Sequence, residues 1–240
     1  MNISKAILLL SILLTSCSKE PSKINLDFNH QVDGESLNLY SLNYQNAYGN
    51  NYNVQLLRYI VTNIELVDAD DSRVELDDFH YVDLEDLTSL SLEKEILIPC
   101  GDYKSIDFTF GLNEAMNISN SHLSEAVHGA MAWPDQMGGG YHYMRIEGAY
   151  IAADESQHFY LTHTGATAGV PRHLNYSIPI NLNAEPDVSN RITLNMNINK
   201  WYDSPNIYNF EEYDSGIMGN PEAQQIIHEN GTDVFSVEVL

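Results

Sequence analysis

Residues 24–30, Ile24-Asn25-Leu26-Asp27-Phe28-Asn29-His30, alternate between apolar and polar side chains. A period of two places every second side chain on one face of an extended chain, so this stretch predicts a β-strand with one buried face. Short segments of the same kind, bounded by Gly, Asn, Asp or Pro, recur along the chain. They cover residues 54–60 with 64–67, 79–84, 96–98, 105–110, 141–147, 158–164, 176–180, 191–198 and 234–239.

About ten strands in one continuous stretch predict an all-β fold, a single β-sandwich or barrel-like domain with long loops. Helical patterns are scarce. Residues 121–127 and 221–229 predict one or two short helices, the second with Pro221 near its start. No linker rich in Pro, Gly or Ser follows residue 23, and we find no internal repeat. We therefore expect one domain over residues 24–240.

The composition supports a folded core and excludes some partners. The chain has 240 residues, of which 43% are apolar, enough for a globular domain. It carries 11 Lys and Arg against 34 Asp and Glu, which gives a formal net charge of −23. Such a chain repels phosphate groups, so neither nucleic acid nor anionic lipid headgroups are expected to bind it electrostatically.

The first residues have the pattern of an export signal. Lys5 precedes an apolar run, residues 6–14, that is too short to span a bilayer. Leu-Thr-Ser-Cys at residues 14–17 resembles a bacterial lipobox, in which the cysteine is diacylated and becomes the new N-terminus. We therefore expect a lipoprotein signal peptide over residues 1–16, lipidation of Cys17, and a short linker over residues 17–23. Acyl chains would then anchor the protein in the outer membrane or at the cell surface, facing the periplasm or the exterior.

The motifs of several enzyme classes are absent from the sequence. There is no P-loop, no dinucleotide-binding glycine motif and no Gly-x-Ser-x-Gly elbow. Cys100 has no thiol-nucleophile context and is expected to be a small buried side chain. The absence of Cys-x-x-Cys-His predicts that this chain carries no haem of its own. The acidic run at residues 77–86 lacks EF-hand spacing and reads as a solvated strand and loop. The protein is therefore expected not to be an enzyme.

Histidine is the metal ligand that the sequence offers, with nine residues against two cysteines. Four histidines within predicted strands are the candidates, and the spacing alone leaves open whether they bind metal or are hydrogen-bonded structural side chains. His122, His173 and His228 lie in loop-like or polar contexts where no role is expected. The four candidates are His30, His80, His142 and His163.

Several blocks of sequence, in order, resemble the MbnP-like copper-binding family, whose members are exported β-sandwich proteins. The main signature is MAWP at residues 131–134 followed by GYHYMRIEG at residues 140–148. The other blocks are FNHQVDG (28–34), LRYIVTNIEL (57–66), FHYVD (79–83), IPCGDY (98–103), FGLN (110–113) and FYLTHTG (159–165). The resemblance extends over about residues 24–240.

This resemblance implies copper binding, as Cu(I), through two histidines that fall by motif on His30 and His80. His163 or His142 would add a further ligand or form a site of their own. In some relatives an oxidised tryptophan completes the site, and a di-haem peroxidase-like partner of the MbnH type makes that modification. No tryptophan flanks His80 here, so Trp133 is the candidate modified residue, with core or turn packing as its alternative.

Two other readings of the same chain stay open. In one, the fold is a surface interaction module for a protein or glycan, its histidines are structural, and its fifteen tyrosines supply a contact face. In the other, the protein is an oxidation substrate of the haem partner, modified at Trp133 or at a tyrosine.

Overall fold

The computed structural model describes residues 20–92, 95–122, 125–167, 169–213 and 216–240. The predicted signal peptide and Cys17 lie outside the described residues. The alternating stretch forms strand β1 (Ser22–Val32), in which every second side chain is buried. The prediction for this segment is confirmed, because the apolar side chains and His30 face the core while the polar ones face solvent.

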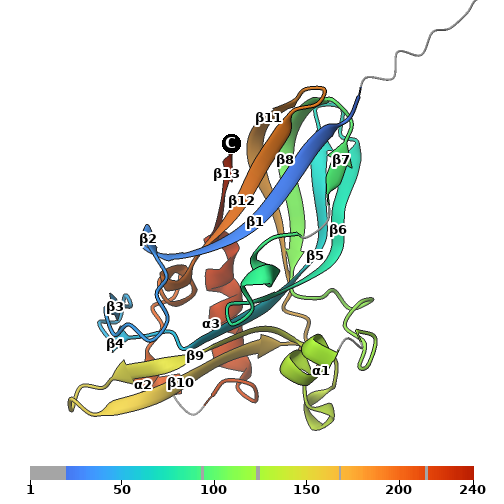
Figure 1. Cartoon of the computed structure of the whole chain (residues 1–240). Helices are drawn as coiled ribbons and strands as arrows, with labels where there is room; N and C mark the ends of the chain where they lie inside the picture. Colours follow the sequence, from blue (N-terminus) through green and yellow to red (C-terminus); the bar gives the residue numbers. More distant parts are fainter. Residues whose placement is uncertain (1–19, 93–94, 123–124, 168, 214–215) are drawn as a thin grey trace, which may run out of the picture.

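Strand β1 is the centre of a five-stranded sheet. It pairs in parallel with β12 (Ser189–Asn197), whose other edge pairs antiparallel with β13 (Phe235–Val239). The opposite edge of β1 pairs at one end with β7 (Ile96–Ile98) and at the other with β2 (Glu35–Ser36). Strands from the two ends of the domain therefore lie side by side in one sheet (Figure 1).

The second sheet has eight strands among the described residues and is antiparallel. Its order is β11-β8-β5-β9-β4-β3, with β6 paired to β5 and β10 paired to β9. The strands are β3 (Tyr44–Gln45), β4 (Asn51–Tyr52), β5 (Leu56–Asp68), β6 (Arg73–Asp83), β8 (Gly101–Phe110), β9 (His142–Ile151), β10 (Gln157–Gly165) and β11 (Leu174–Ala184).

The helices are short and lie outside the sheets (Figure 1). Helix α3 begins at Pro221, and the side chain of Asn220 accepts hydrogen bonds from the next two backbone N–H groups, which confirms the predicted start. The first predicted helix begins later than expected, at Glu125. The helical elements are α1 (Glu125–Met131), α2 (Phe210–Tyr213) and α3 (Pro221–Asn230), with 3-10 turns η1 (Leu87–Leu90), η2 (Asp135–Met137), η3 (Ile198–Tyr202) and η4 (Gly231–Asp233). Within the described part of the chain, no helix combines the length and apolarity needed to cross a membrane.

One large hydrophobic cluster fills the space between the two sheets, and both contribute to it. Eight tyrosines are at most 1% exposed: Tyr52, Tyr59, Tyr141, Tyr143, Tyr150, Tyr160, Tyr202 and Tyr208. Buried phenols need partners for their hydroxyl groups, and Tyr160 donates to the carbonyl of Asn53 while Tyr202 bonds to Thr162. These eight side chains belong to the core and are not part of a contact face.

Three local expectations from the sequence are wrong. The segments 54–60 and 64–67 form one strand, β5, because Asn63 adopts a positive φ of 51° and absorbs a shift in register beside it. The strand predicted over residues 141–147 continues to Ile151 as β9. Cys100 is only partly buried, and its thiol bonds to the carbonyl of Glu20.

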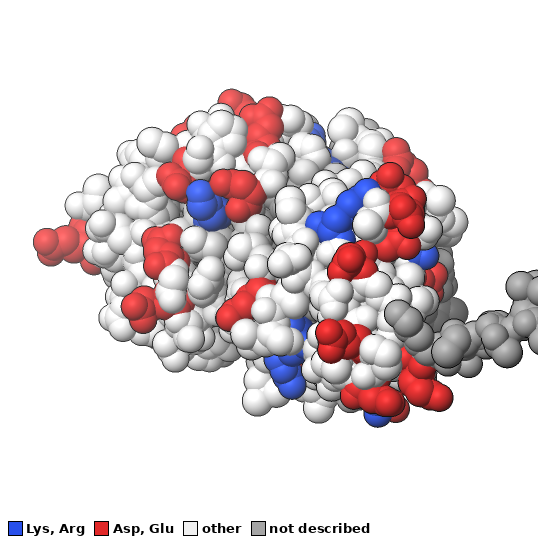
Figure 2. Space-filling model, turned by 90° about the horizontal axis from the view of Figure 1, so that it is seen from above, with Lys and Arg blue, Asp and Glu red and all other residues white. Residues whose placement is uncertain are grey.

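The surface reflects the negative net charge of the chain. Seen from above, acidic side chains are scattered over the face that Figure 2 shows, and the basic side chains on it are isolated and lie beside acidic ones. Several basic residues are held in ion pairs, for example Arg58 with Asp83 at 2.8 Å. This face offers no basic stripe for a nucleic acid.

Gly148 is needed for close packing in the middle of β9. A Cβ atom there would lie 2.0 Å from the carbonyl oxygen of Asn53 and 2.8 Å from the ring of Tyr160. We expect Gly148→Ala to lower the free energy of unfolding by about 2–3 kcal/mol, because backbone atoms must move to admit the methyl group. Gly129→Ala is the matched control, since a Cβ at this helical position meets nothing within 4 Å and alanine favours helices. Urea denaturation measures both, and equal stability of the two variants would contradict this account.

Candidate functional site

The β9–β10 hairpin brings together two of the four candidate histidines. The ring centroids of His142 and His163 lie 5.2 Å apart, with their planes at 85°. In the ladder His163 pairs with Arg145, but Gly165 pairs with His142, so the register shifts by one residue between these positions. A one-residue shift exchanges the faces of a strand, which explains why His142 lies beside His163 rather than behind the hairpin.

His142 is buried, and one of its nitrogens has no partner. The residue is 6% exposed, and Nδ1 lies 3.1 Å from the carbonyl oxygen of Met131. Nε2 is buried and has no hydrogen bond within the described residues. Burial, followed by the proximity of His163, lowers the pKa of His142 to about 4, so the ring is neutral at physiological pH. An unpaired buried nitrogen is costly, and its lone pair is suited to a ligand.

His163 is held by a carboxylate. Its Nε2 lies 2.9 Å from Oε1 of Glu147, which also accepts a hydrogen bond of 2.5 Å from Nη2 of Arg145. The hydrogen bond from His163, with a further contribution from Arg145, lowers the pKa of Glu147 to about 2 against the opposing effect of burial. Arg145 is itself fixed by a 2.6 Å bond to the carbonyl of Ala130. Glu147 therefore sets the orientation of His163.

Trp133 belongs to the same cluster. Its ring centroid lies 4.7 Å from that of His142, and the residue is 2% exposed. The indole N–H donates to the carbonyl of Met137 at 3.3 Å. The ring also covers Gly165, where a Cβ would lie 2.7 Å from the indole. Trp133 thus packs in the core and also contacts a candidate ligand.

His30, which is buried, and His80, which is partly buried, lie elsewhere and use other partners. Nε2 of His30 is 2.9 Å from the hydroxyl of Tyr59, and burial lowers the pKa of His30 to about 4. His80 stacks on Phe28 at 4.6 Å, and its Nε2 is 2.7 Å from the carbonyl oxygen of Ser89. Nδ1 of His80 is 3.8 Å from Asp77. Since Phe28 and His30 share the inner face of β1, both histidines border the same region of the core.

The structure adds two residues that sequence reasoning missed, Arg145 and Glu147. Their spacing of two in a predicted strand places them on one face, but only the pairing with β10 shows that His163 shares that face. Across the residues that the structure describes, no three His, Cys, Asp or Glu side chains are grouped as a metal site. A metal at this cluster would therefore rest on the imidazole pair, which suits copper better than the hard cations that require several oxygens.

The fold and the cluster together define an all-β sandwich protein with an imidazole pair beside a buried tryptophan. A family model described as MbnP matches residues 21–219, most of the chain. The chain belongs to the MbnP family, and the resemblance inferred from the sequence blocks is confirmed. Among solved structures, MbnP from Methylosinus trichosporium matches with a TM-score of 0.50 at 16% identity, over 92% of this chain and 99% of that one. This second likeness supports the fold alone. A search of curated proteins gave no match.

The lowered histidine pKa values predict a loss of stability in mild acid. For His30 and His142 the folded-state pKa is about 4, below the ordinary value of 6.5, so the unfolded chain binds protons first as the pH falls. Stability is fully present above about pH 6.5 and declines toward pH 4. At about pH 5 each of the two histidines should lower the free energy of unfolding by roughly 2 kcal/mol relative to neutral pH.

Urea denaturation from about pH 7.5 to about pH 5 measures this loss for the unchanged chain and for His142→Asn. Asparagine does not titrate in this range. The free energy of unfolding of His142→Asn should therefore fall less between the two pH values, by about the contribution of one histidine. An identical pH dependence of the two proteins would rule out a buried neutral His142.

Proposed function

We propose that this chain is a lipid-anchored copper-binding protein that handles copper outside the cytoplasm, with His142 and His163 as the ligands. The MbnP family match supports the class, and the lipobox-like segment ending at Cys17 supports the anchor. The acquisition, sequestration or delivery of copper is the role, and no catalytic residue is assigned.

The observation that carries the proposal is the buried, unpartnered Nε2 of His142 beside the ring of His163. Metal-bound histidines commonly donate their second N–H to a backbone carbonyl or a carboxylate, which fixes the tautomer and aims the other nitrogen at the metal. Met131 supplies a carbonyl to His142, and Glu147 supplies a carboxylate to His163. Nε2 of His142 and Nδ1 of His163 are then the nitrogens available to copper.

The protonation state of His142 is compatible with metal binding. Copper competes with protons for imidazole, and the low pKa of His142 leaves its nitrogen free of a proton at neutral pH. Imidazole nitrogens are ligands that Cu(I) accepts without thiolate. His30 and His80, the pair implied by the family resemblance, remain the alternative ligands. There, copper would have to replace the contacts to Tyr59 and Ser89.

Metal analysis after copper loading and desalting tests the proposal. The unchanged protein should retain about one copper per chain, and His142→Asn/His163→Asn should retain almost none, because asparagine keeps the polar volume but offers no imidazole nitrogen. His158→Asn is the matched control, since it removes an exposed histidine from the same hairpin and should bind copper normally.

A parallel variant, His30→Asn/His80→Asn, separates the two pairs of histidines. Copper loss in this variant alone would assign the ligands to the other pair and overturn the site proposed here. Retention of copper by both double variants would exclude histidine ligation by either pair. Circular dichroism confirms that each variant is folded before its copper content is compared.

The contact between Trp133 and His142 favours a second, compatible role as an oxidation substrate. A di-haem peroxidase-like partner of the MbnH type would oxidise Trp133, placing a modified ring beside the copper ligands. Peptide mass mapping of protein from its native host should then show a mass change on the peptide containing Trp133. Protein made without the partner should show the unmodified mass, and an unmodified peptide from the native host would exclude this role.

A further inference from the structure

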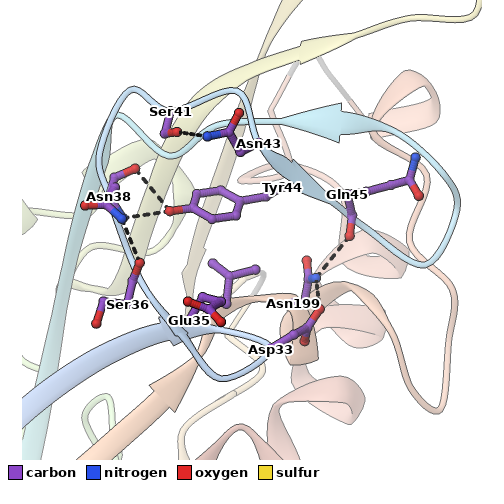
Figure 3. Close-up of a pocket in the computed structure, with 10 residues that line it drawn as sticks. Asp33, Glu35, Ser36, Asn38, Ser41, Asn43, Tyr44, Gln45 and Asn199 are labelled. Carbon is purple, nitrogen blue, oxygen red and sulfur yellow. Dashed lines mark hydrogen bonds between the residues drawn. The ribbon is translucent and has the colours of Figure 1, made fainter.

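We propose that a polar cavity at the end of β1, away from the histidine pair, binds a neutral saccharide. The cavity has a volume of about 520 Å³ and is formed by the β1–β2 hairpin, the loop that follows it, strand β3, and Asn199 of η3 (Figure 3). This volume lies within the roughly 300–1,000 Å³ of typical small-molecule sites.

The lining of the cavity matches a ligand rich in hydroxyl groups. Nine of its ten residues carry side-chain hydrogen-bonding groups: two carboxylates, four amides, two serine hydroxyls and one phenol. No Lys, Arg or His lines it. Carboxylates accept from a sugar hydroxyl, while amides both donate and accept, so neighbouring hydroxyls of a pyranose find complementary groups. The two carboxylates, in a chain of net charge −23, disfavour a phosphate or another anion.

The polar groups are already held in place. Oδ2 of Asp33 accepts a 2.6 Å hydrogen bond from Nδ2 of Asn199, and Oδ1 accepts one of 3.2 Å from Asn197. Asn199 is buried, and its side-chain oxygen accepts from the hydroxyl of Tyr52 at 2.6 Å. Since such fixed groups lose little entropy on binding, they favour a specific ligand. With each oxygen of Asp33 already accepting from an amide, the site suits a hydroxyl donor better than a cation.

An aromatic ring lies across the cavity. The hydroxyl of Tyr44 accepts from the backbone N–H of Asn38 at 2.7 Å, so the ring is fixed among the polar side chains (Figure 3). The ring of Tyr44 also packs against that of Tyr52, with the two ring centroids 5.7 Å apart. A fixed phenol combines an apolar face, on which the C–H face of a sugar ring can pack, with a polar end.

The loop that forms the wall carries a strained, exposed aromatic residue. Tyr40 has a φ of +65° and is 65% exposed. It lies between Asn38 and Ser41, which both line the cavity. A bulky residue in the left-handed region is a genuine outlier, and such strain concentrates at binding sites. The strain therefore supports the view that this loop is shaped for a ligand.

Saturation-transfer-difference NMR of the full chain tests the proposal. The probes are glucose, galactose, mannose, N-acetylglucosamine and their disaccharides. We expect at least one of them to give a signal, with about a tenfold weaker affinity in Glu35→Ala, because an exposed carboxylate that accepts from the sugar is lost. Asn43→Ala serves as a second variant in the same wall.

Glu238→Ala is the matched control, because Glu238 is an exposed glutamate on β13 that does not line the cavity, and this variant should bind the sugar unchanged. His142→Asn/His163→Asn should also bind it unchanged, which keeps this result independent of copper. The absence of signal from every sugar, or equal affinity in both cavity variants and the control, would overturn the proposal. Binding of calcium or tetramethylammonium without any sugar would assign the cavity to a cation and overturn it as well.

Discussion

The parallel pairing of β1 with β12 is the constraint on which the rest of the structure depends. The register runs from Lys23 with Ser189 to Gln31 with Asn197, so the two strands end side by side. The chain continues from one end into Asp33 and from the other into η3. This placement creates the contacts of Asp33 with Asn197 and Asn199 and therefore the wall of the polar cavity. The same register directs Phe28 and His30 into the core, where they meet the second sheet.

The histidine cluster depends on a different feature, the shift in register near the open end of the β9–β10 hairpin. A regular ladder would place His142 and His163 on opposite faces, and each would then be a separate buried imidazole. With the shift, one face carries the two rings together with Arg145 and Glu147. Gly165 completes the arrangement, because the absence of a side chain lets Trp133 pack directly over the hairpin.

The sequence predicts the fold far better than the site. Alternation identifies each long strand, since burial of one face imposes a period of two whatever the partner strand is. The two-residue strands β2, β3 and β4 are too short to show any period, so the sequence does not predict them. Pairing between strands leaves no local trace, so the spacing of the four candidate histidines could not show which of them lie together. The contact of His142 with His163 follows from a one-residue irregularity, and the unpaired nitrogen of His142 follows from tertiary burial. The burial of eight tyrosines could likewise not be predicted, because it depends on packing between segments that are far apart in the sequence.

The parallel β1–β12 pair also determines when folding can finish. The paired residues of β1 and β12 are separated by 166 positions in the sequence. Every strand of the second sheet comes from the segment between them. Loop closure over such a length is slow relative to the formation of local hairpins. A chain emerging from a ribosome or a translocation channel therefore holds β1 as an open edge until residues 189–197 arrive. During that interval the exposed backbone of β1 is available to another chain, which makes premature release a route to aggregation.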